Sequence, residues 1–185
     1  MEQPKVSVYV QGSFFILLSL MLLVLPFSWV LAVILAVVVH ECFHAATIAI
    51  LSGRIYSLNL GAGGIQMETE SLSPGREMLA AVSGPLGSAL LMLLAPWMPR
   101  TAICGMVHCV YNLIPIHPLD GGRILACTLE MLFPGKRGEG IFRLSQIVLR
   151  FLVLIVCMIM GWQWGILPIL VIFLLFKWKR KSRTV

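Results

Sequence analysis

Residues 29–51 read WVLAVILAVVVHECFHAATIAIL, an apolar run in which His40, Glu41 and His44 are the strongly polar side chains. The run exceeds the roughly 20 helical residues that cross a bilayer core. Ionisable groups at membrane depth are costly, and they are usually paired or functional. On a helix, His40 and His44 lie one turn apart on the same face, which suits two imidazoles holding one metal ion. We therefore predict a membrane helix that carries part of a metal site.

The alternative for this motif is a pair of helix histidines that only form hydrogen bonds to their neighbours. Glu41 lies beside the histidines, where a carboxylate acts on a metal-bound water. Cys42 occupies the turn between them, and its direction on the helix diverges from theirs. We expect Cys42 to be a packing residue and not a ligand.

The composition indicates an integral membrane protein. Hydrophobic residues make up 59% of the chain and charged residues 12%, whereas soluble domains carry about 25% charged residues. The five cysteines are scattered through apolar segments without a C-x-x-C pair. Such a pattern is typical of reduced, packed thiols and not of a disulfide framework.

We expect one membrane-embedded, all-α polytopic domain over residues 1–185, with no PDZ domain and no nucleotide-sensing domain. Proline and glycine breaks divide the apolar sequence into about six transmembrane helices. The expected spans are about 13–27, 29–51, 77–97, 101–116, 144–161 and 164–176, with a short helix at about 122–133 between the fourth and fifth spans.

The distribution of basic residues predicts that both termini are cytoplasmic, in a bacterial plasma membrane. Six crossings place both termini on one side, and the positive-inside rule assigns the side richer in Lys and Arg to the cytoplasm. That side holds Lys5, Arg54, Arg76, Lys136, Arg137, Arg143 and the tail residues Lys177, Lys179, Arg180, Lys181 and Arg183. Arg100 falls in an opposite loop. We interpret the basic tail as an anchor on anionic lipid and not as a nucleic-acid site.

A small cytoplasmic-side β-sheet with a re-entrant hairpin is expected beside the helices. Residues 5–11 alternate between apolar and polar, and residues 54–60 and 65–70 flank the turn Gly61-Ala62-Gly63-Gly64. Period-two alternation and a glycine-rich turn are typical of strands and hairpins. A flexible glycine loop without a role is the alternative.

A catalytic zinc ion needs a third protein ligand, and Asp120 is our candidate because it is the only aspartate in the chain. Asp120 ends the stretch Pro115-Ile116-His117-Pro118-Leu119-Asp120, in which prolines break a helix and let the chain turn back. Asp120 could instead cap the helix that follows it. His117 and His108 are rival ligands that we place outside the metal shell, His108 as a packed residue.

With H-E-C-F-H at 40–44 and N-L-I-P-I-H-P-L-D-G-G at 112–122, the chain resembles the site-2 protease family of intramembrane zinc metalloproteases. G-A-G-G at 61–64 and S-G-P-L-G at 83–87 are similar to that family's membrane-edge loop and third-helix motif. The six-span layout without extra domains is most similar to the bacterial branch of the stage IV sporulation protease that activates a sigma factor.

This resemblance implies a metalloendopeptidase with one Zn²⁺ held by His40, His44 and Asp120. It implies that Glu41 is the catalytic acid and base, and that Asn112 stabilises the substrate or the oxyanion. The expected partners are a membrane-tethered or transmembrane protein substrate such as a pro-sigma factor, membrane-protein regulators and the lipid bilayer, with no nucleic acid. The alternative function is a membrane metal transporter or a metal-binding scaffold. The segment 83–87 permits either close helix packing or a simple proline kink.

Overall fold

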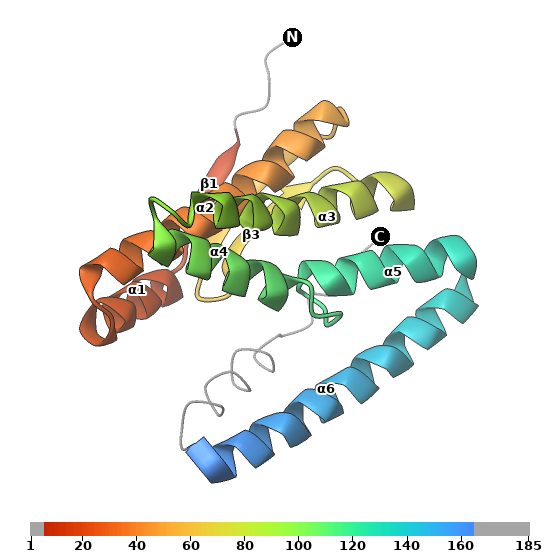
Figure 1. The fold of residues 1–185 in the computed structure, drawn as a ribbon. Helices are drawn as coiled ribbons and strands as arrows, with labels where there is room; N and C mark the ends of the chain where they lie inside the picture. Colours follow the sequence, from red (N-terminus) through yellow and green to blue (C-terminus); the bar gives the residue numbers. More distant parts are fainter. Residues whose placement is uncertain (1–5, 165–185) are drawn as a thin grey trace. The chain divides into compact units, whose positions relative to one another are not determined.

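The computed structural model describes residues 6–164. Along the chain, the elements are β1 (Ser7–Val10), α1 (Gly12–Val24), α2 (Phe27–Ile50), β2 (Ile55–Gly61), β3 (Gly64–Thr69), α3 (Pro74–Leu90), the 3₁₀ turn η1 (Leu91–Leu94), α4 (Pro99–Asn112), α5 (Asp120–Leu132) and α6 (Lys136–Trp164). The described fold is therefore mostly helical with a small sheet, as the sequence predicts (Figure 1).

The chain divides into two compact units, Met1–Phe142 and Arg143–Val185, and all elements from β1 to α5 belong to the first. The boundary falls within α6, which is one continuous helix of 29 residues. The expected span 144–161 lies inside α6, and the expected span 164–176 lies outside the described residues after Trp164. Lys5 and the basic tail, on which the predicted placement of the termini depends, also lie outside them.

The core of the first unit forms where α2 packs against both α3 and α4, while α3 also packs against α5. The face of α2 that turns inward is a stripe repeating mostly every four residues, as the helical period requires. Its members are Val30, Ala32, Ala36, His40, His44 and Ile48. The two histidines thus occupy core positions in the stripe that holds the helices together.

Small residues let α3 approach α2 closely. The buried side of α3 consists of Ala80, Ala81, Ser83, Gly84, Pro85, Gly87 and Ser88. A Cβ atom on Gly87 would overlap the ring of Phe43 on α2. The helix continues through Pro85 to Leu90, so the segment 83–87 serves close helix packing, as small residues do between membrane helices.

The break between α1 and α2 lies at Pro26, close to the boundary expected between the spans 13–27 and 29–51. Leu25 has an extended backbone with φ −108° and ψ 144°, because the ring of a following proline disfavours helical geometry in the residue before it. Pro26 is the N-cap of α2. The single apolar block of the sequence is thereby divided into two helices.

The sheet has three strands in the order β1-β2-β3. β1 runs parallel to β2, with Ser7 opposite Ser57, and β2 runs antiparallel to β3, with Gly61 opposite Gly64. Gly64 has φ +99°, a conformation that favours glycine. The expected hairpin is therefore confirmed, and β1 adds the third strand.

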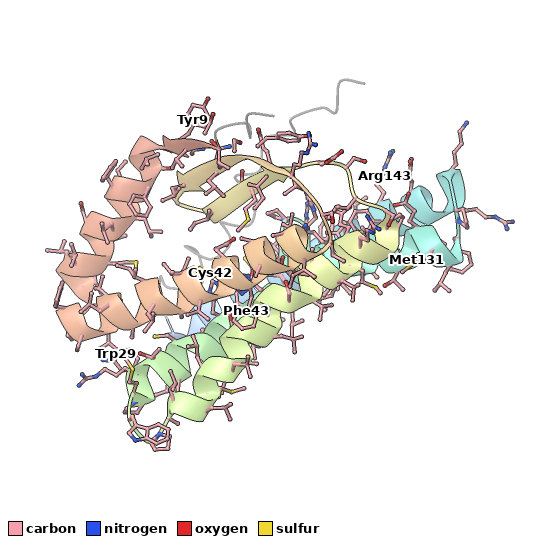
Figure 2. All side chains as sticks on the ribbon, turned by 90° about the horizontal axis from the view of Figure 1, so that it is seen from above. Tyr9, Trp29, Cys42, Phe43, Met131 and Arg143 are labelled. Carbon is pink, nitrogen blue, oxygen red and sulfur yellow. The ribbon has the colours of Figure 1, made fainter. Side chains whose placement is uncertain are left out.

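Large apolar side chains project outward from the helices (Figure 2). Leu23, Ile50 and Leu93 are exposed by 83%, 81% and 70%. Within the described residues, 27–50 and 74–94 are long and apolar enough to cross a membrane, and α1 is a shorter apolar helix. An apolar surface of this extent suits contact with lipid better than contact with water. The count of six crossings stays a prediction.

Candidate metal centre

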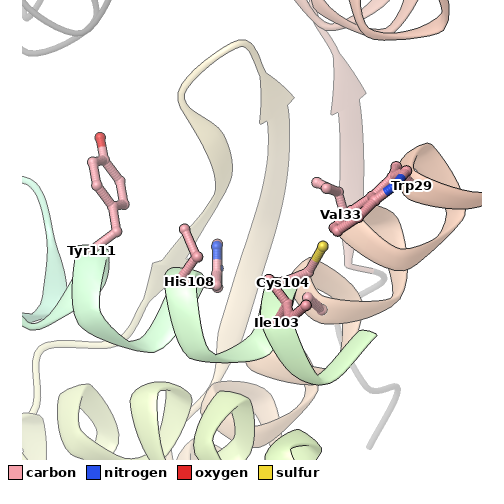
Figure 3. Close-up of a pocket in the computed structure, with 8 residues that line it drawn as sticks. Trp29, Val33, Ile103, Cys104, His108 and Tyr111 are labelled. Carbon is pink, nitrogen blue, oxygen red and sulfur yellow. The ribbon is translucent and has the colours of Figure 1, made fainter. Parts of the chain in front are cut away.

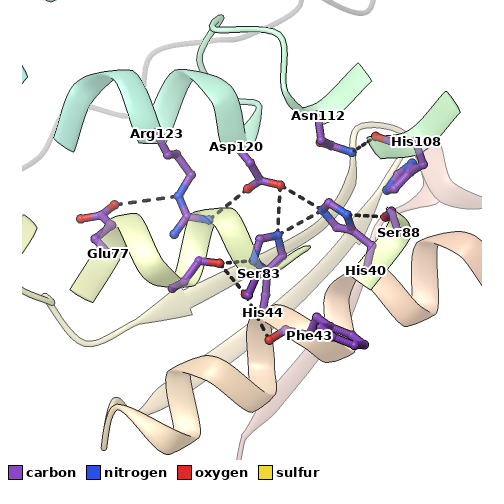
Figure 4. A network of polar contacts seen from close by, with 11 residues as sticks. His40, Phe43, His44, Glu77, Ser83, Ser88, His108, Asn112, Asp120 and Arg123 are labelled. Atoms are coloured by element: carbon purple, nitrogen blue, oxygen red, sulfur yellow. Dashed lines mark hydrogen bonds and ion pairs between the residues drawn. The ribbon is translucent and has the colours of Figure 1, made fainter. Parts of the chain in front are cut away.

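Three side chains that are far apart in the sequence converge between α2 and the start of α5. Oδ2 of Asp120 lies 3.0 Å from Nε2 of His40 and 3.1 Å from Nε2 of His44. The two Nε2 atoms lie 3.1 Å from each other. All three residues are buried, and in Figure 4 their polar atoms point toward one another. Among the described residues, they form the one group of His, Cys, Asp or Glu side chains able to hold a metal ion.

The outer nitrogens of the two imidazoles are held by α3. Nδ1 of His44 donates to the carbonyl oxygen of Ala80 at 2.7 Å, and Nδ1 of His40 lies 2.9 Å from Oγ of Ser88. Because Nδ1 of His44 carries the hydrogen, the Nε2 of a neutral His44 presents a lone pair toward Asp120. Partners of this kind orient metal-binding histidines in many sites.

A zinc ion fits these three atoms. Two ligands of a tetrahedral zinc ion, each at about 2.0–2.1 Å, stand about 3.3 Å apart, close to the observed 3.0–3.1 Å. A single proton bridges only one pair of the three atoms, whereas a cation contacts all of them. Two histidines and one carboxylate also form a known donor set of catalytic zinc, which leaves a position for water.

Asp120 reaches the histidines because the loop 113–119 folds tightly onto the first turn of α5. A Cβ atom on Gly121 would overlap the carbonyl oxygens of Leu113 and Ile114, and one on Gly122 would overlap the backbone at His117. Gly121 and Gly122 are helical, so they are needed for this close approach and not for a sharp turn. The N-cap of α5 is Leu119, without a side-chain cap, so Asp120 is not the helix cap.

Gly84 brings the backbone of α3 against both imidazole rings. A Cβ atom at this position would overlap Nε2 of His44 and would lie 2.8 Å from Cε1 of His40. Any larger residue at position 84 would displace the rings or occupy the space beside Nε2. Gly84 is thus part of the wall of the site.

Arg123 connects the other oxygen of Asp120 to α3. Nη1 of Arg123 lies 3.4 Å from Oδ1 of Asp120, and its Nε lies 3.9 Å from Oε1 of Glu77. Arg123 follows Asp120 by three residues on the same helix, a spacing that places two side chains side by side. The carboxylate of Asp120 is therefore held between the histidines and a guanidinium.

Of the two residues predicted to act on substrate, Glu41 interacts with this group, and Asn112 contacts the backbone of its neighbour His108. Glu41 is half-buried and interacts electrostatically with His44, Asp120 and Arg123. Asn112 is the last residue of α4, and its Nδ2 donates to the carbonyl oxygen of His108 at 3.0 Å. Cys42 is exposed and is not a member of the three-residue group.

Neither rival histidine belongs to the group of three. The ring of His108 meets the ring of His40 edge to face, with centroids 4.5 Å apart. His108 is therefore a packed residue, as expected, but it packs against a predicted ligand. His117 lies in the tight loop before Asp120 and is half-buried.

No family model matches the chain. A Synechocystis protein that is named as a zinc metalloprotease is 30% identical to this chain over 142 residues, which cover 64% of this chain and 37% of that protein. Stage IV sporulation protein FB of Bacillus subtilis is 28% identical over 151 residues, covering 72% of this chain and 51% of that protein. The chain thus spans about half, or less, of the length of these curated relatives.

The solved structure of the site-2 protease from Methanocaldococcus jannaschii superposes with a TM-score of 0.73 at 17% identity, over 100% of this chain and 97% of that one. The chain therefore has the fold of a site-2 protease. The resemblance deduced from the motifs is thereby confirmed at the level of the fold.

Three contributors to the candidate metal centre were not predicted from the sequence. Arg123 could have been found from its spacing of three residues after Asp120. Ser88 and the carbonyl group of Ala80 gave no signal, because a buried serine and a backbone oxygen resemble those of any packed helix. Their role depends on how α3 lies against α2.

Proposed function

We propose that this chain is a zinc-dependent intramembrane endopeptidase that cleaves a membrane-associated protein. The observation that carries the proposal is the convergence of His40, His44 and Asp120 around one point, with their polar atoms 3.0–3.1 Å apart. The fold of the site-2 protease and the zinc metalloprotease named among the relatives support the same activity.

Glu41 is the proposed general base and acid. A bound zinc ion supplies Lewis acidity and lowers the pKa of water from 15.7 to about 7. Glu41 then accepts the proton of the attacking water and later delivers it to the leaving amine. Its position beside His40 and its interaction with His44 and Asp120 suit that role.

Asn112 is the proposed donor to the substrate carbonyl oxygen. An asparagine amide carries two hydrogens, and one of them is engaged by the carbonyl group of His108. Among the described residues no partner is seen for the second hydrogen, which would stabilise the negative charge that develops on the substrate oxygen. Such a contribution is worth about 2.7–4 kcal/mol where it has been measured for one such donor.

The hairpin is the proposed docking edge for substrate. A helical substrate hides its peptide bonds, so it must become extended before attack. β3 pairs with β2 on one side only, and no other described strand covers its second edge. An extended segment can add to such an edge through main-chain hydrogen bonds.

The decisive test compares the wild type with Glu41→Gln in purified, zinc-quantified preparations incubated with a membrane-tethered substrate. We expect Glu41→Gln to bind zinc and fold normally while its cleavage rate falls by at least 10²-fold, the scale of a lost general base. Chelation of zinc should stop the wild type, and added zinc should restore it. Persistent cleavage by Glu41→Gln would refute the assigned base. Metal flux through vesicles without proteolysis would favour the transporter instead.

The proposed substrate class is a membrane-tethered regulator, of which a pro-sigma factor is one example. Stage IV sporulation protein FB among the relatives supports the sporulation branch. We propose a bacterial plasma membrane location and regulation by other membrane proteins. Co-expression with candidate tethered transcription factors from the same cell, scored for release of the soluble fragment, tests this assignment.

A further inference from the structure

A pocket between α2 and α4 lies next to the metal centre and belongs to none of the roles assigned above. It encloses about 270 Å³ and is lined by Trp29, Val33, Ala36, Ile103, Cys104, Val107, His108 and Tyr111. Cys104, His108 and Tyr111 project from the same side of α4 (Figure 3). This cavity is called the α2–α4 pocket below.

The α2–α4 pocket leads to a predicted metal ligand. On α2, its residues Trp29, Val33 and Ala36 are spaced by four and three, and the next position in that stripe is His40. On α4, the pocket includes His108, whose ring touches the ring of His40. One end of the pocket is therefore separated from the metal centre only by contacting imidazoles.

The chemistry of the walls selects an apolar occupant. Aliphatic and aromatic side chains make up most of the lining, and most of its exposed area is apolar. Ile103 and Val107 stand at the outside, with 46% and 59% of their surfaces exposed, so the pocket can be entered from the surroundings. Its volume is below the roughly 300–1,000 Å³ of pockets that hold whole small-molecule ligands.

We propose that the α2–α4 pocket is a specificity site that receives one apolar side chain of the substrate, of leucine to phenylalanine size, next to the scissile bond. This inference rests on the proposed function, because a peptide bond at the metal centre places a neighbouring side chain within reach of His108. The occupant is a side chain because the space is small and lies next to the candidate metal centre, with the contacting rings of His108 and His40 between them.

The first experiment fills the pocket from its rim. Val107→Trp adds bulk inside the pocket, whereas Val110→Trp adds the same bulk one turn along α4 at an exposed position that does not line it. Two forms of a membrane-tethered substrate carry either leucine or alanine beside the cleaved bond. We expect wild-type kcat/KM to favour leucine about tenfold or more, Val107→Trp to lose this preference, and Val110→Trp to keep it.

The second experiment needs no cleavage. In two full-length variants, every cysteine except Cys104 or except Cys109 is replaced by alanine, and both carry Glu41→Gln. Cys104 lines the pocket, whereas Cys109, also half-exposed, does not. Two peptides are compared, with either leucine or alanine beside the bond that is cleaved in the substrate. The leucine peptide should slow N-ethylmaleimide labelling of Cys104 at least fivefold more than the alanine peptide does. It should leave the labelling rate of Cys109 unchanged.

Equal protection by both peptides, or equal protection of both cysteines, would overturn the proposal. Protection of Cys104 by a fatty acid alone, with none by peptide, would assign the pocket to lipid and would also overturn it. A wild type that cleaves no substrate would refute the proposed function, while the labelling result would still decide whether the pocket binds an apolar side chain.

Discussion

At the scale of single residues, the proposed metal centre depends on neighbours that are not among its proposed ligands. Gly84 leaves room for both imidazoles, Ser88 and the carbonyl group of Ala80 hold their outer nitrogens, and Arg123 contacts the second oxygen of Asp120. Losing such a supporting partner typically lowers metal affinity by 10- to 100-fold. Two of these positions can be tested directly.

Gly84→Ala should lower zinc affinity by at least tenfold, because its new methyl group would overlap His44 beside Nε2. Gly75→Ala on the same helix is the matched control, since a Cβ atom there meets nothing within 4 Å. Competition with a chromogenic chelator measures both affinities. If Gly84→Ala binds zinc as tightly as Gly75→Ala, the close approach of α3 to the rings is wrong.

Ser88→Ala removes the hydroxyl that lies 2.9 Å from Nδ1 of His40. We expect about tenfold weaker zinc binding with little change in folding, because the imidazole loses the partner that fixes its orientation. Thr128→Val is the control, since its hydroxyl donates to Ile124 within α5 and not to a histidine. Equal zinc affinity in the two variants would show that Ser88 does not orient His40.

At the scale of elements, the sequence predicted what depends on local pattern. The apolar stretch around His40, the break at Pro26 and the glycine turn at 61–64 all have local signals, and the structure contains the corresponding helix, break and hairpin. The parallel pairing of β1 with β2 had none, because Ser7 and Ser57 are far apart in sequence. The start of α6 at Lys136 was missed because a helix can extend beyond its apolar section into charged residues.

The edge of β3 offers a test at this scale. Consecutive N–H groups of a strand point to opposite sides within the sheet, so proline at Gln66 and proline at Met67 remove different groups. One variant loses an N–H that faces β2, and the other loses an N–H at the proposed docking edge. We expect the variant that loses the N–H at the docking edge to keep its zinc content and thermal stability while its cleavage rate falls at least tenfold.

Parallel assays of melting temperature, zinc content and cleavage distinguish the two proline variants. The docking role of β3 fails if both variants cleave as the wild type does. It also fails if cleavage falls only in the variant that loses stability, because the loss would then reflect damage to the sheet.

At the scale of the whole molecule, the orientation in the membrane is a prediction from charge. We expect Gly63→Cys, in the β2–β3 turn, to be labelled from the cytoplasmic side, and Trp97→Cys, near the start of α4, from the opposite side. Both positions are exposed. A membrane-impermeant maleimide applied to oriented vesicles of otherwise cysteine-free protein measures this. Labelling of both positions from one side would refute the assigned topology.

The parallel pairing of β1 with β2 has a consequence for biosynthesis. β1 leaves the ribosome early, but its partner residues 57–60 follow only after both α1 and α2. The nascent chain must therefore complete α1 and α2 before β1 can form its hydrogen bonds with β2. By contrast, β2 and β3 can pair as soon as both have been synthesised. A stalled chain ending shortly before residue 55 should expose β1 to protease, and one extended past residue 69 should protect it.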